Sequence, residues 1–280
     1  MPENLKRLLT TYSYNILGSL EDARDVVQDA FLKFHLVDKG EIQDEKAYLI
    51  RMVINLSINL KKKLQKTVDE YPGEWLPEPV STDSADSEID KKEALSYSLM
   101  VLLEKLNPRQ RGVFILKEAF DYDHEEIADV LGISADNSRQ LLNRAKKQLH
   151  KPSAPEEEGA NTRNLDRYLE VIHAGDVTRL EELLNEDILA ISDGGGRAVA
   201  AINPVEGVRA VAAFLQGIYK KFYSAAKVAK AEINKQPALF YYDGANVATC
   251  QVFNFENGKL ISVFFIRNPK KLLSLQKKVV

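Results

Sequence analysis

The sequence predicts a multidomain protein in which two all-α segments precede an α+β domain. Apolar residues recur at helical spacing through the first half of the chain, and strand-like runs separated by turn pairs fill the last quarter. Two stretches rich in proline and acidic residues interrupt these patterns. A length of 280 residues suits two or three domains. We therefore expect helical domains at 1–66 and 91–151, linkers at 67–90 and 152–163, and an α+β domain at 164–280.

The composition narrows the class of protein. A net charge of -3 does not mark a general nucleic-acid binder, so any contact with DNA has to come from local patches. The single cysteine, Cys250, excludes an intramolecular disulfide and lies in an apolar run, where a buried and inert thiol is expected. The sequence shows neither a leader pattern nor an apolar run of about 20 residues. We expect a soluble, cytoplasmic protein without a membrane partner, a metal site or a cofactor.

Three amphipathic helices are predicted in the first domain. They cover residues 4–17, 21–36 and 46–66, and a loop containing Gly40 separates the last two. The helix at 21–36 has an acidic outward face, and the helix at 46–66 ends in a lysine run at 61–63 that we expect to lie outside. A solvated surface explains both patterns by itself, because cations are favoured at the carboxyl end of a helix.

The first linker contains one unusual residue. Prolines at 72, 77 and 79 prevent a helix from running through this acidic stretch. Trp75 is the only tryptophan of the chain, and such a large amphipathic ring seldom lies in an unbound tether. We therefore expect Trp75 and Leu76 to dock on the surface of a domain. A fully exposed linker is the alternative.

The second domain is predicted to contain two short helices around a tight turn, after helices at 91–106 and 108–120. Asp123 and Glu126 form a capping box, Gly132 supplies the turn, and Ser134 caps the second helix, whereas Ile133 is expected to be buried. The layout is that of a helix-turn-helix, in which amides and guanidinium groups read base edges and cations contact phosphates. The outward residues of the second helix are the candidate DNA contacts: Asn137, Arg139, Gln140, Asn143, Arg144 and Lys147. A helical hairpin with a solvated basic face is the alternative.

The last domain has helical patterns followed by strand patterns. Helices are predicted at 164–173, 177–184 and 205–222, and the apolar segment ILAIS ends in a run of three glycines. The strand candidates are 228–233, 238–242, 247–255 and 259–267, with Asp243-Gly244 and Asn257-Gly258 as turn signals. Helices followed by an antiparallel sheet predict an α+β fold.

Two motifs resemble the extracytoplasmic-function (ECF) class of bacterial sigma factors. LNPRQRGVFILKEAFDYDHEEIADVLGIS followed by RQLLNRAKKQL resembles sigma region 4, which contacts the minus-35 promoter element, and DARDVVQDAFLKF resembles the region 2 helix that binds the polymerase beta-prime subunit. The resemblance implies core-polymerase contacts at Asp25, Gln28, Asp29 and Phe31. It also places a second set against the minus-10 element: Asn55, Asn59, Lys61, Lys62 and Lys63. The sequence departs from the family pattern at Tyr48, where tryptophan is common, and at Asn59, where aspartate is common.

The last domain resembles the SnoaL-like branch of the nuclear-transport-factor (NTF2) fold, and the whole chain resembles ECF sigma factors with this extension. Three motifs support the resemblance: WLPEP in the linker, the triple-glycine motif DGGGR, and NPKKL near the carboxyl end. Since three glycines allow close approach by another segment, we expect the motifs to take part in interdomain docking. The residues concerned are Trp75, Leu76, Pro77, Asp193, Gly194, Gly195, Gly196, Arg197, Asn268 and Pro269.

The resemblance implies a sigma factor that binds core RNA polymerase, through its beta-prime and beta subunits, and promoter DNA. The last domain would regulate in cis by docking on the sigma regions. Residues 201–280 contain 12 Lys/Arg and 4 Asp/Glu, against 26 and 37 in residues 1–200, and this contrast favours intramolecular association. The alternative is a helix-turn-helix transcription regulator with a small-molecule-sensing domain. The sequence leaves open whether an anti-sigma factor or a ligand of the last domain exists.

Catalysis in the last domain is not expected. NTF2-like enzymes use a buried carboxylate as base together with a hydrogen-bond donor. The candidates by residue type alone are Tyr219, Tyr223, Tyr241, Tyr242, His173 and Asp193. The sequence does not assemble them into a base, an oxyanion donor and an orienting group, so we predict that the protein is not an enzyme.

Overall fold

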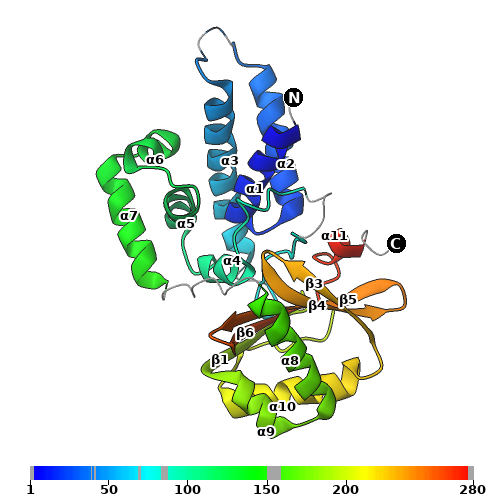
Figure 1. Ribbon diagram of the computed structural model, residues 1–280. Coiled ribbons are helices and arrows are strands. Elements are labelled where there is room, and N and C mark those ends of the chain that lie inside the picture. Colours follow the sequence, from blue (N-terminus) through cyan, green and yellow to red (C-terminus); the bar gives the residue numbers. More distant parts are fainter. Residues whose placement is uncertain are drawn as a thin grey trace. The chain divides into compact units, whose positions relative to one another are not determined.

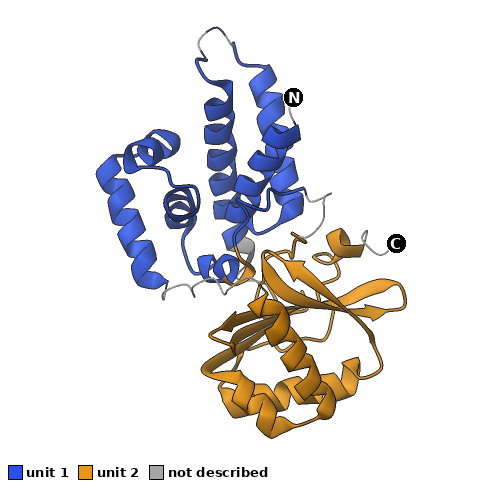
Figure 2. Ribbon diagram, in the orientation of Figure 1, with its two compact units in different colours: residues 1–70, 85–95, 99–152 blue, residues 71–84, 96–98, 153–280 orange. Residues whose placement is uncertain are grey.

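The structure is a computed structural model that describes residues 3–38, 40, 42–68, 71–82, 88–149 and 159–276, without the side chains of 66–68. The chain forms two compact units, which Figure 2 shows in different colours. The helical unit comprises residues 1–70, 85–95 and 99–152, and the α+β unit comprises 71–84, 96–98 and 153–280. The two predicted all-α domains therefore belong to one unit. Most of the predicted second linker, residues 152–158, lies outside the described residues.

The first predicted domain consists of three helices (Figure 1). They are α1 (Glu3–Leu17), α2 (Leu20–His35) and α3 (Glu45–Val68), close to the bounds that the periodicity predicts. Ser19 begins α2 because its hydroxyl accepts a hydrogen bond from the backbone N–H of Asp22 at 3.2 Å. The buried apolar residues of α2, among them Ala23, Val27 and Phe34, lie on one face of the helix.

The helix predicted at 91–106 is shorter than expected. Only α4 (Tyr97–Leu103) forms, and residues 94–96 are not helical. The side chain of Asn15 explains the difference, because its Nδ2 donates to the Glu93 carbonyl at 2.9 Å and its Oδ1 accepts from the Leu95 N–H at 3.4 Å. These bonds use backbone groups that a longer helix would have paired internally. Helix propensity is thus overridden by a contact 80 residues away in sequence.

The helix-turn-helix is confirmed in its details. It follows α5 (Pro108–Phe114) and a π-helical turn at Ile115–Ala119, and it consists of α6 (His124–Leu131) and α7 (Ala135–Gln148). Asp123 and Glu126 form the predicted reciprocal capping box, and Ser134 accepts a hydrogen bond from the Asn137 N–H. Gly132 ends α6 with a φ of 62°, in the left-handed region that favours glycine. Ile133 is only half-buried, so the prediction that it is buried is wrong.

The α+β unit contains a six-stranded sheet with strand order β2-β1-β6-β5-β4-β3. The strands are β1 (Leu184–Asp193), β2 (Val205–Glu206), β3 (Lys227–Ile233), β4 (Gln236–Asp243), β5 (Asn246–Glu256) and β6 (Lys259–Ile266). Strand β1 runs parallel to β6, and all other pairs are antiparallel. The four predicted strands, β3 to β6, pair antiparallel as predicted. The sequence did not predict that β1 joins the sheet parallel to β6.

Helices α8 (Ala160–Ala174), α9 (Val177–Leu183) and α10 (Val208–Ile218) cover one face of this sheet (Figure 1). A π-helical turn, Tyr219–Tyr223, follows α10, and a short α11 (Leu273–Gln276) follows the sheet. Alternate residues of β5 and β6, including Phe253 and Phe265, join the core beneath the helices. Phe264 points to the opposite face, where its ring lies 5.5 Å from that of Tyr97. The predicted α+β class is confirmed.

Three observations on the described residues concern membrane spans, metal sites and the single cysteine. No helix among them has both the length and the apolar character needed to cross a membrane. No group of three or more His, Cys, Asp or Glu side chains in this part of the chain is arranged to hold a metal ion. Cys250 is fully buried, and burial raises the pKa of its thiol, as expected for an inert cysteine.

Candidate functional sites

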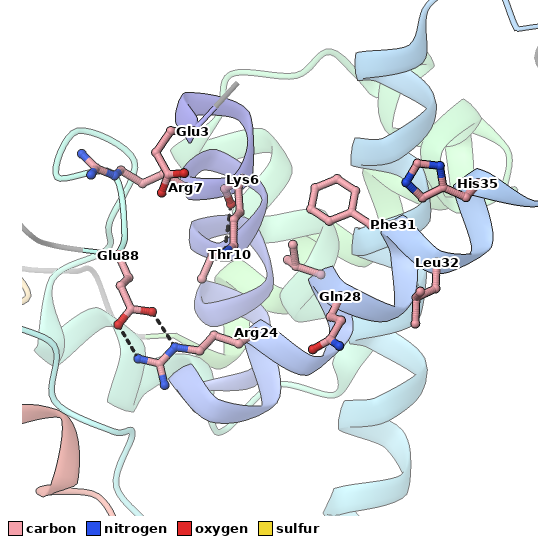
Figure 3. A pocket seen from close by; sticks show the side chains of 11 residues that line it. Glu3, Lys6, Arg7, Thr10, Arg24, Gln28, Phe31, Leu32, His35 and Glu88 are labelled. Carbon is pink, nitrogen blue, oxygen red and sulfur yellow. Dashed lines mark hydrogen bonds and ion pairs between the residues drawn. The ribbon is translucent and has the colours of Figure 1, made fainter. Parts of the chain in front are cut away.

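A groove lies between α1 and α2 in the helical unit (Figure 3). Its volume is about 680 Å³, and its lining includes the predicted polymerase contacts Gln28 and Phe31. Gln28 is exposed and Phe31 half-buried, while Asp25 and Asp29 are exposed on α2 without lining the groove. Leu32, next to Phe31, leaves 58% of its surface exposed. The four predicted residues are therefore accessible, and their role in polymerase binding remains a prediction.

An ion pair borders this groove. Arg24 of α2 donates two hydrogen bonds to the carboxylate of Glu88, at 2.5 and 2.6 Å (Figure 3). Glu88 belongs to the segment that connects α3 to α4, so this segment contacts α2 beside Gln28. Both side chains are about half exposed. The pair contributes little stability, because water screens exposed charges.

The predicted minus-10 residues on α3 differ in accessibility. Asn59, Lys62 and Lys63 are exposed, whereas Asn55 is half-buried. The Nδ2 of Asn55 donates to the carbonyls of Arg51 at 2.9 Å and of Val130, at the end of α6, at 2.7 Å. Next to this contact, Arg51 pairs with Asp129 of α6. The helix-turn-helix thus packs on the α3 face that the resemblance assigns to DNA.

Lys61 corrects the prediction that all three lysines lie outside. It is only 6% exposed, and its Nζ donates to the Leu17 carbonyl at 2.9 Å and to the Glu104 carboxylate at 2.8 Å. In this arrangement Lys61 does not face solvent, so it cannot contact a phosphate. The lysine run suggested exposure, although Lys61 lies on the same helix face as the buried Ile54 and Ile58.

A buried charge network that the sequence did not predict surrounds Glu104. The Arg111 guanidinium, fully buried on α5, donates to Glu104 and also to the Asn15 carbonyl of α1 at 2.9 Å. Burial alone would raise the pKa of the Glu104 carboxyl, but the charges of Arg111 and Lys61 outweigh it and lower that pKa. The network joins α1, α3 and α5, so it holds the predicted region 2 against α5 of the predicted region 4.

The outward face of α7 is exposed, as its periodicity predicts. Arg139, Gln140, Asn143, Arg144 and Lys147 are exposed, and Asn137 is half-buried. Arg139 also bonds to Asp136 at 2.7 Å, within the first turn of the same helix. The faces alternate as expected because Leu141, Leu142 and Ala145 are buried. Whether these side chains read DNA remains a prediction.

The three motifs predicted to dock meet inside the α+β unit. Asp193, at the end of β1, is fully buried. Its carboxylate accepts hydrogen bonds from the Tyr71 hydroxyl at 2.6 Å and from the Leu76 N–H at 3.0 Å, and it pairs with the Lys271 ammonium at 2.5 Å. The Lys271 Nζ also donates to the Leu76 carbonyl and lies 4.1 Å from the centre of the Trp75 ring. We call this arrangement the linker-docking site.

The triple glycine is needed for this approach. A Cβ on Gly195 would lie 2.6 Å from Cγ of Asn268 and 3.0 Å from the Tyr71 hydroxyl, and a Cβ on Gly196 would lie 2.8 Å from Cγ of Pro72. Both glycines also have positive φ, 58° and 67°. Gly194 has close backbone neighbours as well, since a Cβ there would lie 3.1 Å from the Ala198 carbonyl carbon.

The remaining docking candidates lie around this centre. Asn268 is buried and donates to the Tyr71 hydroxyl at 2.9 Å, and Pro77 is buried with its carbonyl accepting from Tyr97 at 2.6 Å. Arg197 and Pro269 are exposed. Sequence reasoning missed Tyr71 as a functional residue, and nothing in its neighbourhood distinguishes it. The sequence indicated Lys271 only as part of the NPKKL motif.

The candidate catalytic side chains do not form one site around Asp193. The Asp193 carboxylate is occupied by Lys271 and the linker. Tyr223 and Tyr241 stack in the core with ring centres 4.0 Å apart, and burial raises the pKa of both hydroxyls. The other candidates, His173, Tyr219 and Tyr242, are exposed or half-buried.

The comparisons with known proteins account for the whole chain. Residues 3–67 match the family model for Sigma-70 region 2, and residues 96–149 match that for Sigma-70, region 4. ECF RNA polymerase sigma factor SigJ of Mycobacterium tuberculosis (strain ATCC 25618 / H37Rv) is 30% identical over 285 residues, covering 96% of this chain and 91% of SigJ. The chain belongs to the ECF sigma factors. A probable ECF sigma factor SigI of the same species (strain CDC 1551 / Oshkosh) is 27% identical and covers 94% of this chain and 91% of SigI.

The similarity extends to three dimensions. The crystal structure of M. tuberculosis SigJ superposes with a TM-score of 0.80 at 29% identity, covering 97% of both chains. This ECF sigma factor therefore shares with SigJ both helical sigma regions and the sheet-containing domain that follows them. As a sigma factor it directs transcription initiation together with core RNA polymerase and promoter DNA.

Proposed function

We propose that the α+β domain of this ECF sigma factor regulates transcription initiation in cis, by holding the linker that joins the two DNA-reading regions. The supporting observation is the buried Asp193 carboxylate, which binds Tyr71 and Leu76 of the linker and Lys271 of its own domain. A segment tethered in this way is always at high effective concentration, so a modest contact is enough to control its state.

In this proposal the groove between α1 and α2 receives the polymerase. Gln28 and Phe31 combine a hydrogen-bonding amide with an aromatic ring inside the groove, and Asp25 and Asp29 add negative charge beside it. A partly apolar groove with a charged rim suits a helical partner surface. The polymerase contacts therefore lie on α2, as the family resemblance implies.

Promoter reading requires a rearrangement of the helical unit. Asn55 lacks a donor for bidentate reading of a base edge while its Nδ2 donates to the carbonyls of Arg51 and Val130. The same α3 face also carries Asn59 and Lys62, which a DNA strand would have to reach. We propose that binding to polymerase moves the helix-turn-helix away from α3, so that α3 reads the minus-10 element and α7 the minus-35 element.

The α+β domain acts without catalysis in this proposal, and the protein acts in the cytoplasm beside the polymerase. A domain whose buried carboxylate is already paired lacks the free base that the enzymes of this fold use. What the domain supplies is a binding surface for the linker.

The test is transcription with purified core polymerase on a selected promoter library. Specific initiation above that of core alone is expected, and its absence on every promoter would contradict the proposal. Cutting the chain after Leu149, or replacing Gly194 to Gly196, should change promoter output. If promoter output and polymerase affinity are both unchanged, the proposed regulation in cis is contradicted, but the sigma function is not.

A further inference from the structure

A small pocket in the helical unit gathers polar groups from α3 and α5. Its volume is about 70 Å³, and its lining contains Asn55, Asn59 and Lys62 of α3, Arg109 of α5, and four aliphatic side chains. No carboxylate lines it. Asn59, Lys62 and Arg109 are exposed, and within the described part of the chain neither cation forms an ion pair.

The orientation of the Asn55 amide is determined by its neighbours. Its nitrogen donates to two backbone carbonyls, at 2.7 and 2.9 Å, and only the NH₂ group of an amide can do so. The polar atom of Asn55 that remains is therefore Oδ1, which accepts hydrogen bonds. The pocket lining thus combines two cations with the amides of Asn55 and Asn59.

We propose that this pocket binds a phosphate-type oxyanion. Arg109 and Lys62 supply charge-assisted hydrogen bonds to phosphate oxygens, and Asn59 adds a neutral donor. Hydrogen phosphate also carries an O–H at neutral pH, which a DNA phosphodiester lacks, and this O–H can donate to an amide oxygen. The pocket has room for roughly two water molecules of about 30 Å³ each, which is comparable in size to a phosphate group.

Occupation of the pocket would bridge the two sigma regions. Lys62 belongs to region 2 and Arg109 to region 4, so one anion between them stabilises the packing of α3 against the helix-turn-helix. This consequence rests on the proposed function, because α3 residues that hold the anion cannot read a promoter at the same time. The binding itself does not depend on that function. Its source can be free phosphate or a backbone phosphate of DNA.

Thermal unfolding of the full-length free protein tests the binding. At constant ionic strength, 5 to 10 mM phosphate in place of chloride should raise Tm by about 2–4 °C. The rise should disappear in Arg109→Gln and Lys62→Gln and persist in Lys63→Gln, which removes a neighbouring exposed charge that does not line the pocket. The comparison among variants cancels the general stabilising effect of phosphate salts.

A short nonpromoter DNA duplex in place of phosphate distinguishes the two sources. If a backbone phosphate fits, the duplex raises Tm and the same two substitutions remove the rise. If only the free ion fits, the duplex has no effect that depends on Arg109. The proposal is overturned if Arg109→Gln responds to both probes in the same way as the unmodified protein and the control Lys63→Gln.

A transcription assay tests the consequence separately. With core polymerase, replacing chloride by phosphate should reduce promoter output several-fold for the unmodified protein and less for Arg109→Gln. Equal inhibition of both proteins would contradict the competition, even where the Tm experiment supports the site. Failure of all initiation would instead contradict the proposed function.

Discussion

Two carboxylates hold distant segments together, one in each unit, and they do so by different means. Glu104 in the helical unit binds two cations, Lys61 and Arg111. Asp193 in the α+β unit binds one cation, Lys271, and otherwise accepts from neutral donors of the linker and from the Gly195 N–H at 3.0 Å. Charge therefore contributes most to the contacts of Glu104, whereas the backbone geometry around Asp193 contributes most to the contacts of Asp193.

The difference indicates how each contact can be released. A network of three charges responds to pH and to the loss of one member, because the remaining charges stay buried without a partner. A site built from hydrogen bonds and a close glycine approach responds to steric change. We therefore expect charge substitutions to affect the helical unit most, and backbone substitutions to affect the linker-docking site most.

The largest effect is expected for Glu104→Gln. The substitution leaves the buried guanidinium of Arg111 and the ammonium of Lys61 without a carboxylate, which should lower the free energy of unfolding by about 3–5 kcal/mol. Urea denaturation measures this change. Glu118→Gln, which removes an exposed carboxylate paired with Lys146, is the control and should change stability by less than about 1 kcal/mol. Equal effects of the two substitutions would show that the Glu104 network does not stabilise the unit.

The pH dependence should follow the same carboxyl. Its folded pKa lies below the ordinary value of 4.5, so its contribution is fully present above pH 4.5 and is lost as pH falls through the folded pKa. Below pH 4.5 the stability difference between the unmodified protein and Glu104→Gln should therefore narrow. A difference that stays constant from pH 7 to pH 3 would contradict the lowered pKa.

A smaller effect is expected at the triple glycine. Gly195→Ala places a methyl group against Asn268 and Tyr71 at a positive φ, which should destabilise the docked linker by about 1–3 kcal/mol. Gly244→Ala is the matched control, because Gly244 has a similar φ of 60° and no atom within 4 Å of the added Cβ. Limited proteolysis of the linker measures docking. Equal cleavage of both variants would mean that only backbone strain matters.

The smallest effect is expected at the Arg24–Glu88 pair. Both side chains are about half exposed, so Glu88→Gln should change the free energy of unfolding by no more than about 1 kcal/mol. Because the pair borders the groove that contains Gln28, the substitution should instead change the affinity for core polymerase. Fluorescence anisotropy with labelled protein measures that affinity. An unchanged affinity would show that the segment between α3 and α4 does not contribute to polymerase binding.

The sequence predicted local features well where one residue type has one structural role. The capping residues Asp123 and Ser134 and the left-handed Gly132 define the helix-turn-helix without information from elsewhere in the chain. The Asp193-Gly194-Gly195-Gly196 run was informative for the same reason, because consecutive glycines indicate that another chain segment approaches closely. The sequence could not show which segment approaches the glycines, because Tyr71 lies 122 residues away from Asp193.

The features that sequence reasoning missed depend on distant partners. Lys61 looked like an exposed member of a lysine run, but Glu104 and the Leu17 carbonyl bind it in the interior. Residues 93–95 looked helical, but the Asn15 side chain binds their backbone. In both cases a tertiary hydrogen bond decides between two conformations that local propensity permits.

The central claim is that docking of the linker on the α+β domain controls promoter output. Trp75 is the only tryptophan of the chain and contacts Lys271 in the docking site, so its emission reports docking directly. The decisive measurement pairs Trp75 emission of the free protein with core-dependent promoter output for Gly195→Ala and Gly244→Ala. The account predicts that Gly195→Ala shifts the emission to longer wavelength and changes output, whereas Gly244→Ala does neither. A shifted emission with unchanged output would contradict it.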